Sequence, residues 1–166
     1  TGKTLTPIGL LNTKKIIFVC AVRHIGLALA KAAISIEKNV AFAFGCNDIE
    51  DIRLHYYSAK EYIRNTKTGG IFKVDNSVGD KVELMISDIK SYEYAMHYMI
   101  SFNKKEDIIL YWDEPTVTLD YDIHPCHDFI KNNWNKNIIP NIVLSSATLP
   151  EYNELDKTIL NYKNKF

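Results

Sequence analysis

The sequence predicts an α/β protein whose mainly parallel β-sheet is flanked by helices on both faces. Short apolar runs, rich in β-branched and aromatic residues, alternate with longer segments whose apolar residues recur at helical spacing. Strands buried on both faces have such nearly continuous apolar runs, and strands alternating with helices are typical of parallel sheets. The two observations together indicate one sheet covered by helices.

The apolar runs give the predicted strands in chain order. They are residues 15–20, 40–44, 82–87, 108–112 and 142–145. Helices are predicted for residues 5–11, 21–38, 48–64, 91–102, 129–134 and the tail 151–166, and residues 65–79, which contain three glycines, are predicted to be a loop. Pro7 is expected within the first turn of the first helix, where a missing N–H costs least.

Length and composition indicate an ordinary globular domain. The chain has 166 residues, and its 20 Lys and Arg balance 20 Asp and Glu, so an anionic partner would need a local basic patch. Three scattered cysteines favour reduced thiols and an intracellular setting: cytoplasm, nucleus, or a viral factory if the source is viral. No apolar run reaches membrane-spanning length, so we expect no membrane partner.

The predicted strand at 108–112 ends in two carboxylates and a proline. Pro115 cannot donate to a sheet, so the strand must end near Asp113 and Glu114. The carboxyl edge of such a sheet is where α/β proteins bind their ligands. One carboxylate can hold Mg²⁺ through its waters, and the next can polarise a water for attack. An acidic turn without function is the alternative.

The residues Thr1-Gly2-Lys3-Thr4 match the last part of a phosphate-binding loop. Gly2 lets the backbone approach phosphates, Lys3 adds a positive charge, and the Thr4 hydroxyl can reach Mg²⁺. The first half of that loop and the strand before it do not precede Thr1 in this sequence.

Polar residues follow other predicted strands. Arg23 stands after the strand at 15–20, where it can meet phosphate or remain a solvated side chain. Ser146 and Thr148 follow the strand at 142–145, and their hydroxyls can hydrogen-bond a carboxylate on the neighbouring strand.

Two further groups of residues have alternative interpretations. Five basic residues and three tyrosines between 53 and 73 resemble a nucleic-acid surface, but nearby acids favour a solvated face; they are Arg53, Lys60, Arg64, Lys67, Lys73, Tyr56, Tyr57 and Tyr62. His124, Cys126 and His127 are possible zinc ligands, although their spacing fits no usual closed site and no fourth ligand is evident.

Three blocks in order, Thr1-Gly2-Lys3-Thr4, Asp113-Glu114-Pro115-Thr116 and Ser146-Ala147-Thr148, resemble the first RecA-like domain of a superfamily 2 (DEAD/DEAH-like) helicase. They correspond to that family's Walker A, Walker B and S-A-T motifs. Arg23 matches one position of its P-T-R-E-L-A motif, and Ser87-Asp88 falls where the family places another nucleic-acid-contacting turn. The likeness spans nearly the whole chain.

The resemblance implies a RecA-like P-loop NTPase domain over residues 1–166, which lacks half of Walker A and the second RecA-like domain. ATP would be bound by Gly2, Lys3 and Thr4, and Mg²⁺ by Thr4 and Asp113. Glu114 and Asp113 would be catalytic, Glu114 by activating water. Arg23, Ser87, Ser146 and Thr148 would contact nucleic acid or couple it to the acids. The partners implied are DNA or RNA and a second RecA-like domain of the same parent chain, without which the isolated chain is inactive or weak.

Two alternatives remain. Asp113-Glu114-Pro115-Thr116 with Leu119-Asp120 is also similar to an ABC-type ATPase block, but no L-S-G-G-Q-like signature stands in 91–106, and Ser146-Ala147-Thr148 follows the next strand. The other alternative is a RecA-like scaffold that binds partners without hydrolysing ATP.

Overall fold

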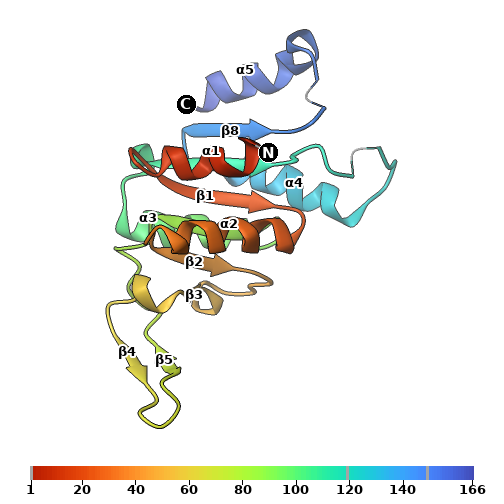
Figure 1. The fold of residues 1–166 in the computed structure, drawn as a ribbon. Helices are drawn as coiled ribbons and strands as arrows, with labels where there is room; N and C mark the ends of the chain where they lie inside the picture. Colours follow the sequence, from red (N-terminus) through yellow and green to blue (C-terminus); the bar gives the residue numbers. More distant parts are fainter. Residues whose placement is uncertain (1, 119, 149) are drawn as a thin grey trace.

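The structure is a computed structural model that describes residues 2–118, 120–148 and 150–166, with side chains from residue 5 onward. A six-stranded sheet forms its centre, in the order β3-β2-β6-β1-β7-β8 (Figure 1). The strands are β1 (Lys15–Cys20), β2 (Val40–Ala43), β3 (Arg53–Leu54), β6 (Leu84–Asp88), β7 (Ile108–Asp113) and β8 (Asn141–Ser145). All neighbours are parallel except β3, which is antiparallel to β2. The expected α/β class and mainly parallel sheet are therefore confirmed.

The register of the central strands aligns their carboxyl ends. Strand β1 lies between β6 and β7, and Cys20 at its end is level with Asp88 of β6. At the next pair, Asp113 of β7 is level with Ser145 of β8. Residues that directly follow these strands are therefore gathered at one edge of the sheet.

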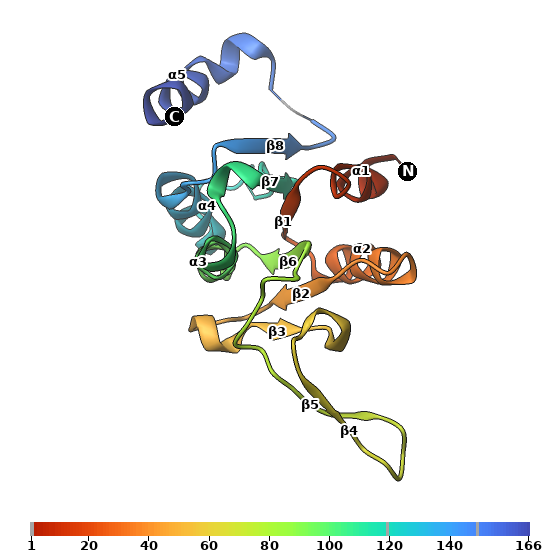
Figure 2. The ribbon, with the colours of Figure 1, turned by 90° about the vertical axis from the view of Figure 1, so that its left-hand side faces the viewer.

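Helices cover both faces of the sheet, as Figure 2 shows. Helices α1 (Gly2–Leu10) and α2 (Arg23–Ser35) lie on one face, and α3 (Tyr92–Phe102) and α4 (Pro125–Lys136) on the other. Each face has its own apolar core, because alternate residues of each strand point to opposite sides. On the α2 side Leu29 and Ala33 pack with Phe18, and on the α3 side Met96 and Met99 pack with Leu110.

Helix α2 lies close to the sheet because Gly26 has no side chain. A Cβ atom at Gly26 would stand 2.6 Å from Cγ2 of Ile86 and 2.9 Å from Sγ of Cys20. Such distances are well inside van der Waals contact, so a larger residue would push the helix away from the sheet. The close approach fixes the start of α2, and with it Arg23, relative to the ends of β1 and β6.

The predicted helix at 48–64 is wrong. A single 3₁₀ turn, η1 (Ile49–Asp51), is closed by reciprocal bonds between Asp48 and Asp51, and the chain then extends into β3. There Leu54 is level with Ala41 of β2, and the His55 N–H donates to the Val40 carbonyl at 2.9 Å. A second 3₁₀ turn, η2 (Tyr56–Ser58), follows. Hydrogen bonding to the edge of β2 outweighs the weak helical spacing.

The predicted loop at 65–79 is also wrong in part. Strands β4 (Tyr62–Arg64) and β5 (Ile71–Val74) form an antiparallel hairpin, and β5 lies within the region expected to be irregular. The turn between them has Asn65 Oδ1 accepting from the Lys67 N–H at 2.9 Å and Gly69 at φ +70°. Asn and Gly supply the side-chain acceptor and the positive φ that a tight turn requires.

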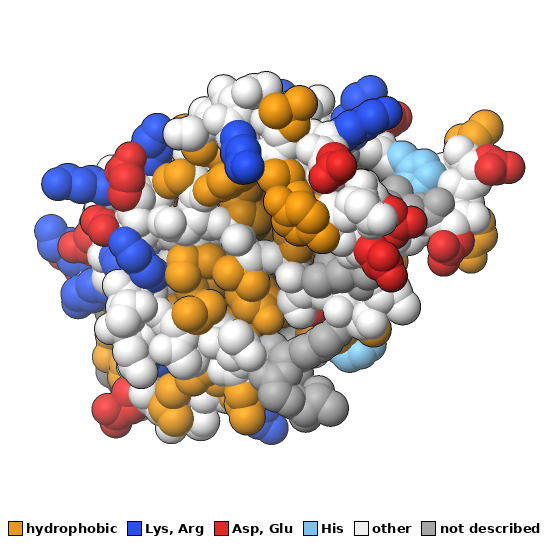
Figure 3. Space-filling model, turned by 90° about the horizontal axis from the view of Figure 1, so that it is seen from above, with side chains coloured by type: hydrophobic (Ala, Val, Ile, Leu, Met, Phe, Trp, Pro, Cys, Tyr) orange, Lys and Arg blue, Asp and Glu red, His pale blue; other side chains and the backbone are white. Residues whose placement is uncertain are grey.

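The chain ends in α5 (Asp156–Lys165), which follows η4 (Tyr152–Leu155) and lies beyond β8 (Figure 1). The Tyr162 hydroxyl donates to the Pro140 carbonyl at 2.7 Å, which ties α5 to the start of β8. A groove of about 310 Å³ lies between α4, β8 and this segment. Figure 3 views this end of the molecule and shows apolar side chains in the middle of the face.

Two smaller expectations concern the N-terminal helix and the membrane. Because α1 begins at Gly2, Pro7 lies in its second turn and not in its first, so that expectation is wrong. Among the described residues, no helix combines the length and apolar character that crossing a bilayer requires.

Candidate functional site

The carboxyl edge of the sheet brings Glu114 and Ser146 together. β7 ends at Asp113, and the chain turns at Glu114, whose φ of 49° lies in the left-handed region. The Glu114 N–H donates to the Ser145 carbonyl at 2.7 Å, which fixes the turn to the end of β8. A left-handed non-glycine residue costs of order 1 kcal/mol and persists only where its surroundings enforce it.

The Glu114 carboxylate is held by two donors that follow β8. Oε2 accepts from the Ser146 hydroxyl at 2.8 Å, and Oε1 accepts from the Ala147 N–H at 3.1 Å. The expectation that a hydroxyl after β8 bonds a carboxylate after β7 is therefore confirmed for Ser146. Charge-assisted bonds to both oxygens fix the orientation of the carboxylate.

The Ser146 hydroxyl is the centre of this contact. Its one proton is used by Glu114, so its remaining contacts are ones in which it accepts. The Thr148 N–H donates to it at 3.3 Å, and Oγ1 of Thr116 lies 3.3 Å away. Thr148 contributes its backbone N–H to the network, and its side chain is exposed. A movement of residues 146–148 would consequently change the position of the carboxylate.

Asp113 is half-buried at the end of β7, beside Glu114. The N-terminal end of α1 lies on the side of the sheet to which β1 and β8 run (Figure 1). The expected nucleotide-binding side chains Lys3 and Thr4, together with Thr1 and Leu119, lie outside the part of the chain that is described. For Gly2 the structure gives only its place as the first residue of α1.

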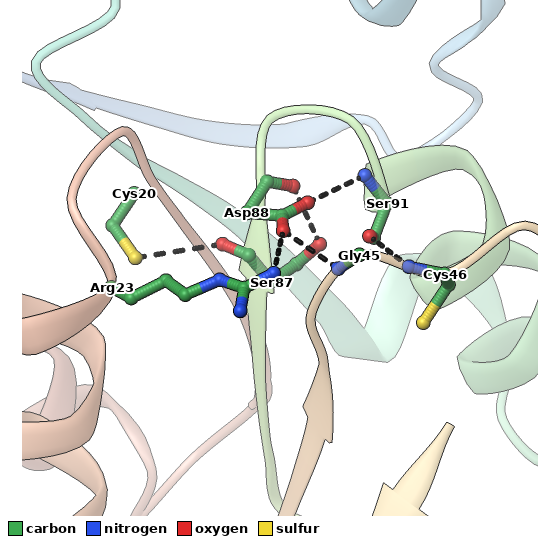
Figure 4. A network of polar contacts seen from close by, with 7 residues as sticks. All are labelled: Cys20, Arg23, Gly45, Cys46, Ser87, Asp88 and Ser91. Carbon is green, nitrogen blue, oxygen red and sulfur yellow. Dashed lines mark hydrogen bonds and ion pairs between the residues drawn. The ribbon is translucent and has the colours of Figure 1, made fainter. Parts of the chain in front are cut away.

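A second polar network at the same edge is centred on Asp88 (Figure 4). Oδ2 of Asp88 accepts from the Gly45 N–H at 2.8 Å and from the Arg23 guanidinium at 3.3 Å. Oδ1 accepts from the Ser91 N–H at 2.9 Å. One carboxylate thereby joins the residues that follow β1, β2 and β6.

Arg23 is the exposed cation of this second network. Its side chain is 59% exposed, and its guanidinium lies 5.2 Å from the centre of the Phe44 ring. The ion pair with Asp88 is open to water, so its contribution to stability is at most about 1 kcal/mol. Arg23 therefore presents a fixed positive charge at the surface, where an anion can reach it.

Ser87 lies in a different environment from the one expected of a surface contact. Its side chain is buried, and its hydroxyl donates to the Asp88 carbonyl at 2.8 Å. Sequence reasoning gave Ser87 a contact role and missed Asp88 as the centre of the network. The signal was present, because Asp88 directly follows an apolar run, as Asp113 does.

Cys20, at the end of β1, lies between the two networks. Its thiol donates to the Ser87 carbonyl at 3.6 Å. Burial raises the pKa of Cys20 to about 11, and the nearby carboxylates of Asp113 and Asp88 add to the shift. The thiol stays protonated at neutral pH and is a poor nucleophile there.

The residues His124, Cys126 and His127 have other contacts. Nδ1 of His124 accepts from the Cys126 N–H at 3.1 Å and so caps α4. Nε2 of His127 lies 2.7 Å from the Thr118 carbonyl. Within the described ranges, no group of three or more His, Cys, Asp or Glu side chains is arranged to hold a metal ion.

Neither protein-family models nor curated protein sequences match this chain. The fold defines an α/β protein with an ordered carboxylate at the carboxyl edge of a parallel sheet, and the residues at that edge are the basis for assigning a function.

Proposed function

We propose that this chain is the ATP-binding domain of a nucleic-acid-dependent ATPase. In this proposal the domain is RecA-like and belongs to a helicase or translocase that couples ATP hydrolysis to movement on, or unwinding of, DNA or RNA. A second RecA-like domain of the same parent chain completes the nucleotide site. The observation that carries the proposal is the Glu114 carboxylate, which Ser146 and the Ala147 N–H hold at the sheet edge.

The donor set at this edge fits a magnesium–nucleotide complex. Adjacent carboxylates at Asp113 and Glu114 suit a hard cation and its waters, and oxygen is the ligand that Mg²⁺ prefers. Mg²⁺ would be held by Asp113 and Thr4, and the phosphates by Gly2, Lys3 and Thr4 at the start of α1. When bound, ATP with Mg²⁺ supplies the phosphoryl group that water attacks.

Glu114 has the role of orienting the attacking water and accepting its proton. Catalysis of phosphoryl transfer depends mainly on positioning and charge, so a carboxylate of fixed direction is the feature required. Ser146 is a positioning residue, because it acts through Glu114. Ser146 directly follows β8. If residues 146–148 moved when nucleic acid bound, the Glu114 carboxylate would move with them and the position of the attacking water would change.

Arg23 supports nucleic acid as the partner. The guanidinium is exposed at the same sheet edge and is oriented by Asp88 and Phe44. An Arg fork is suited to a phosphate group, and exchanging Asp88 for phosphate would keep its charge compensated. Ser87 acts in this proposal through its bond to the backbone of Asp88.

The experiment that tests the role of Glu114 measures ATP turnover. In the parent protein, Glu114→Gln keeps the size of the side chain and removes its basicity. We expect phosphate release stimulated by single-stranded nucleic acid to fall about 10²- to 10⁴-fold, with nucleotide affinity retained. Asp122→Asn is the matched control, since Asp122 is an exposed acid in the loop after β7 and should leave turnover unchanged.

Binding of a fluorescent ATP analogue separates the alternatives. Lys3→Ala should weaken nucleotide binding, because in this proposal it removes a positive charge that would neutralise the phosphates. Unchanged ATP turnover in Glu114→Gln would show that Glu114 does not activate the attacking water. Unchanged nucleotide affinity in Lys3→Ala would show that Lys3 does not bind the phosphates. Nucleic-acid binding without any turnover would favour the scaffold, whereas turnover that nucleic acid does not stimulate would favour an ABC-type ATPase.

A further inference from the structure

The β4–β5 hairpin extends away from the body of the protein. It leaves the sheet beside β3, and most of it stands clear of the core, although Val74 at the end of β5 is partly buried against the core on the α3 side (Figures 1 and 2). All three residues of β4 are exposed, and large apolar side chains on the hairpin face solvent: Tyr62 is 40%, Ile63 57% and Phe72 75% exposed. A two-stranded hairpin gains little from its own burial, so these exposed side chains suit contact with a partner.

The base of the hairpin is nevertheless held to the body. The Asp75 N–H donates to the Glu61 carbonyl at 3.0 Å and so closes the two ends of the hairpin, and Oδ1 of Asn76 accepts from the Leu54 N–H of β3 at 2.8 Å. The Tyr98 hydroxyl of α3 donates to the Asn76 carbonyl at 2.8 Å. The bonds from Leu54 of β3 and Tyr98 of α3 fix the base of the hairpin and the direction in which it extends from the sheet.

Three tyrosines, Tyr56, Tyr57 and Tyr62, form an aromatic cluster at the base of the hairpin. The ring centres of Tyr56 and Tyr57 are 4.3 Å apart, and those of Tyr56 and Tyr62 are 5.3 Å apart. Tyr57 is 59% exposed, and the His55 ring packs against Tyr56 with ring centres 4.6 Å apart. The tyrosine cluster is therefore a supported aromatic surface with faces open to solvent.

A cation lies over this cluster. The Arg64 guanidinium carbon is 5.9 Å from the ring centres of both Tyr56 and Tyr62. Arg64 can keep its ring contacts and bind a phosphate at the same time, because a guanidinium presents its flat face to a ring and its edge to an oxyanion. Aromatic rings with an attached Arg are the arrangement that binds single-stranded nucleic acid through base stacking and phosphate contact.

The charge of the hairpin points to a polyanion. Residues 60–75 contain four cations and two carboxylates, so the segment has a net charge of +2 in a chain whose net charge is zero. Among the described residues, the cations Lys60, Arg64, Lys67 and Lys73 form no ion pair. Lys60 and Lys73 also line a groove of about 620 Å³ that includes Tyr62.

We propose that the hairpin and the tyrosine cluster bind single-stranded nucleic acid, with bases stacking on Tyr57 and Tyr62 and phosphates meeting Arg64 and the lysines. The inference rests on the proposed function for its choice of DNA or RNA as the partner. Nucleic acid is favoured over a protein because clustered, solvent-exposed aromatic rings and an excess of cations occur together here. The hairpin would extend the contact beyond Arg23 at the sheet edge.

The test of stacking measures the affinity of the chain for a fluorescein-labelled single-stranded oligonucleotide by anisotropy, without ATP. Tyr57→Ala combined with Tyr62→Ala should weaken binding about tenfold or more, because each stacked base contributes substantially to affinity. Tyr57→Phe combined with Tyr62→Phe keeps both rings and should keep binding within about twofold. Equal affinity of the Ala pair and the unchanged protein would overturn the proposal.

The test of phosphate contact measures how affinity depends on salt. The logarithm of the binding constant falls as the logarithm of the salt concentration rises. Arg64→Ala should make this fall less steep by about 0.7, the value for one lost phosphate contact on a single strand. Lys157→Ala combined with Lys163→Ala removes two exposed cations from α5 and should leave the slope unchanged. If the salt dependence became less steep for the α5 pair but not for Arg64→Ala, the phosphate contact would lie on α5 and not on the hairpin.

The outcomes also separate this inference from the proposed function. If the Ala pair loses oligonucleotide binding while the parent protein shows no turnover, the hairpin site stands and the ATPase proposal fails. If turnover is stimulated by nucleic acid and the hairpin variants change neither affinity nor stimulation, the ATPase proposal stands and the hairpin site fails. In that second case the exposed hairpin would fit a protein partner instead.

Discussion

At the scale of the residue, Ser146 has a defined chemical task. Its hydroxyl donates to Glu114 and accepts from the Thr148 N–H, so it links the turn after β7 to the turn after β8. The sequence predicted a hydroxyl–carboxylate bond here because both residues follow apolar runs. It could not predict that the Ala147 N–H would be the second donor, since that bond depends on the backbone conformation after β8.

Replacing Ser146 tests this link. Ser146→Ala should lower kcat about tenfold with KM little changed, because the carboxylate keeps its charge and loses one of its orienting bonds. Steady-state ATP hydrolysis by the parent protein gives both constants. Thr116→Val is the control, since Oγ1 of Thr116 lies 3.3 Å from the Ser146 hydroxyl and would act on Glu114 only through it, so a smaller effect is expected. A rise in KM with unchanged kcat would contradict the positioning role.

At the scale of the element, the strands were predictable and the region from 48 to 79 was not. Strands β1, β2, β6 and β7 lie inside the sheet and β8 lies at its edge, and each of the five contains a continuous apolar run. Ile52 and Leu54 instead alternate with the exposed Arg53, and two buried positions are too few to distinguish a strand from a helix. The hairpin has almost no buried residue, so hydrophobic spacing contained no information about it.

The packing of α3 on α4 depends on buried polar groups. The Tyr92 hydroxyl of α3 donates to Oδ1 of Asn137 at 2.5 Å, and both side chains are at most 1% exposed. Asn137 also bonds both backbone groups of Ile139, which sets the chain direction into β8. Asn133 of α4 donates to the Ile89 carbonyl at 2.7 Å. These bonds place the end of α4, and hence β8, relative to α3.

Removing the Tyr92 hydroxyl should destabilise this junction. We expect Tyr92→Phe to lower the free energy of unfolding by about 1–2 kcal/mol, because the buried Asn137 oxygen loses its strongest partner. Urea unfolding followed by circular dichroism measures this change as a lower midpoint with an unchanged m-value. Tyr121→Phe is the matched control, since Tyr121 is 63% exposed and should change stability by less than about 0.5 kcal/mol. Equal midpoints for both variants would show that the bond contributes nothing.

At the scale of the whole molecule, the α/β class and the edge at which the site lies follow from the order of strands and helices. Parallel strands end at one edge, so residues that follow them must meet there, whatever their separation in sequence. The pairing of Arg23 with Asp88 was less predictable, because it depends on β1 and β6 being neighbours while residues 21–83 separate them in the chain.

The same arrangement buries a thiol and a phenol in their protonated forms. Their burial predicts how the stability of the protein depends on alkaline pH. Burial raises the pKa of Cys20 to about 11 from the ordinary value of 9.0, and that of Tyr98 to about 12 from 10.0. Above pH 9 the unfolded chain therefore loses protons that the folded protein retains. Neither group changes the free energy of unfolding below that pH, and both lower it as pH rises, with the Cys20 contribution lost between about pH 9 and 11.

Urea unfolding from pH 7 to 10 should show this decline, of which Cys20 accounts for about 1 kcal/mol at pH 10. Cys20→Ala removes the titrating group, so its stability should fall less steeply over the same range, even though the variant is less stable throughout. Val19→Ala is the control, because it shortens a neighbouring buried side chain of β1 and removes no titrating group, so it should lower stability by the same amount at every pH. Parallel curves for Cys20→Ala and the unchanged protein would mean that the thiol ionises alike in both states, and that the end of β1 is open to water.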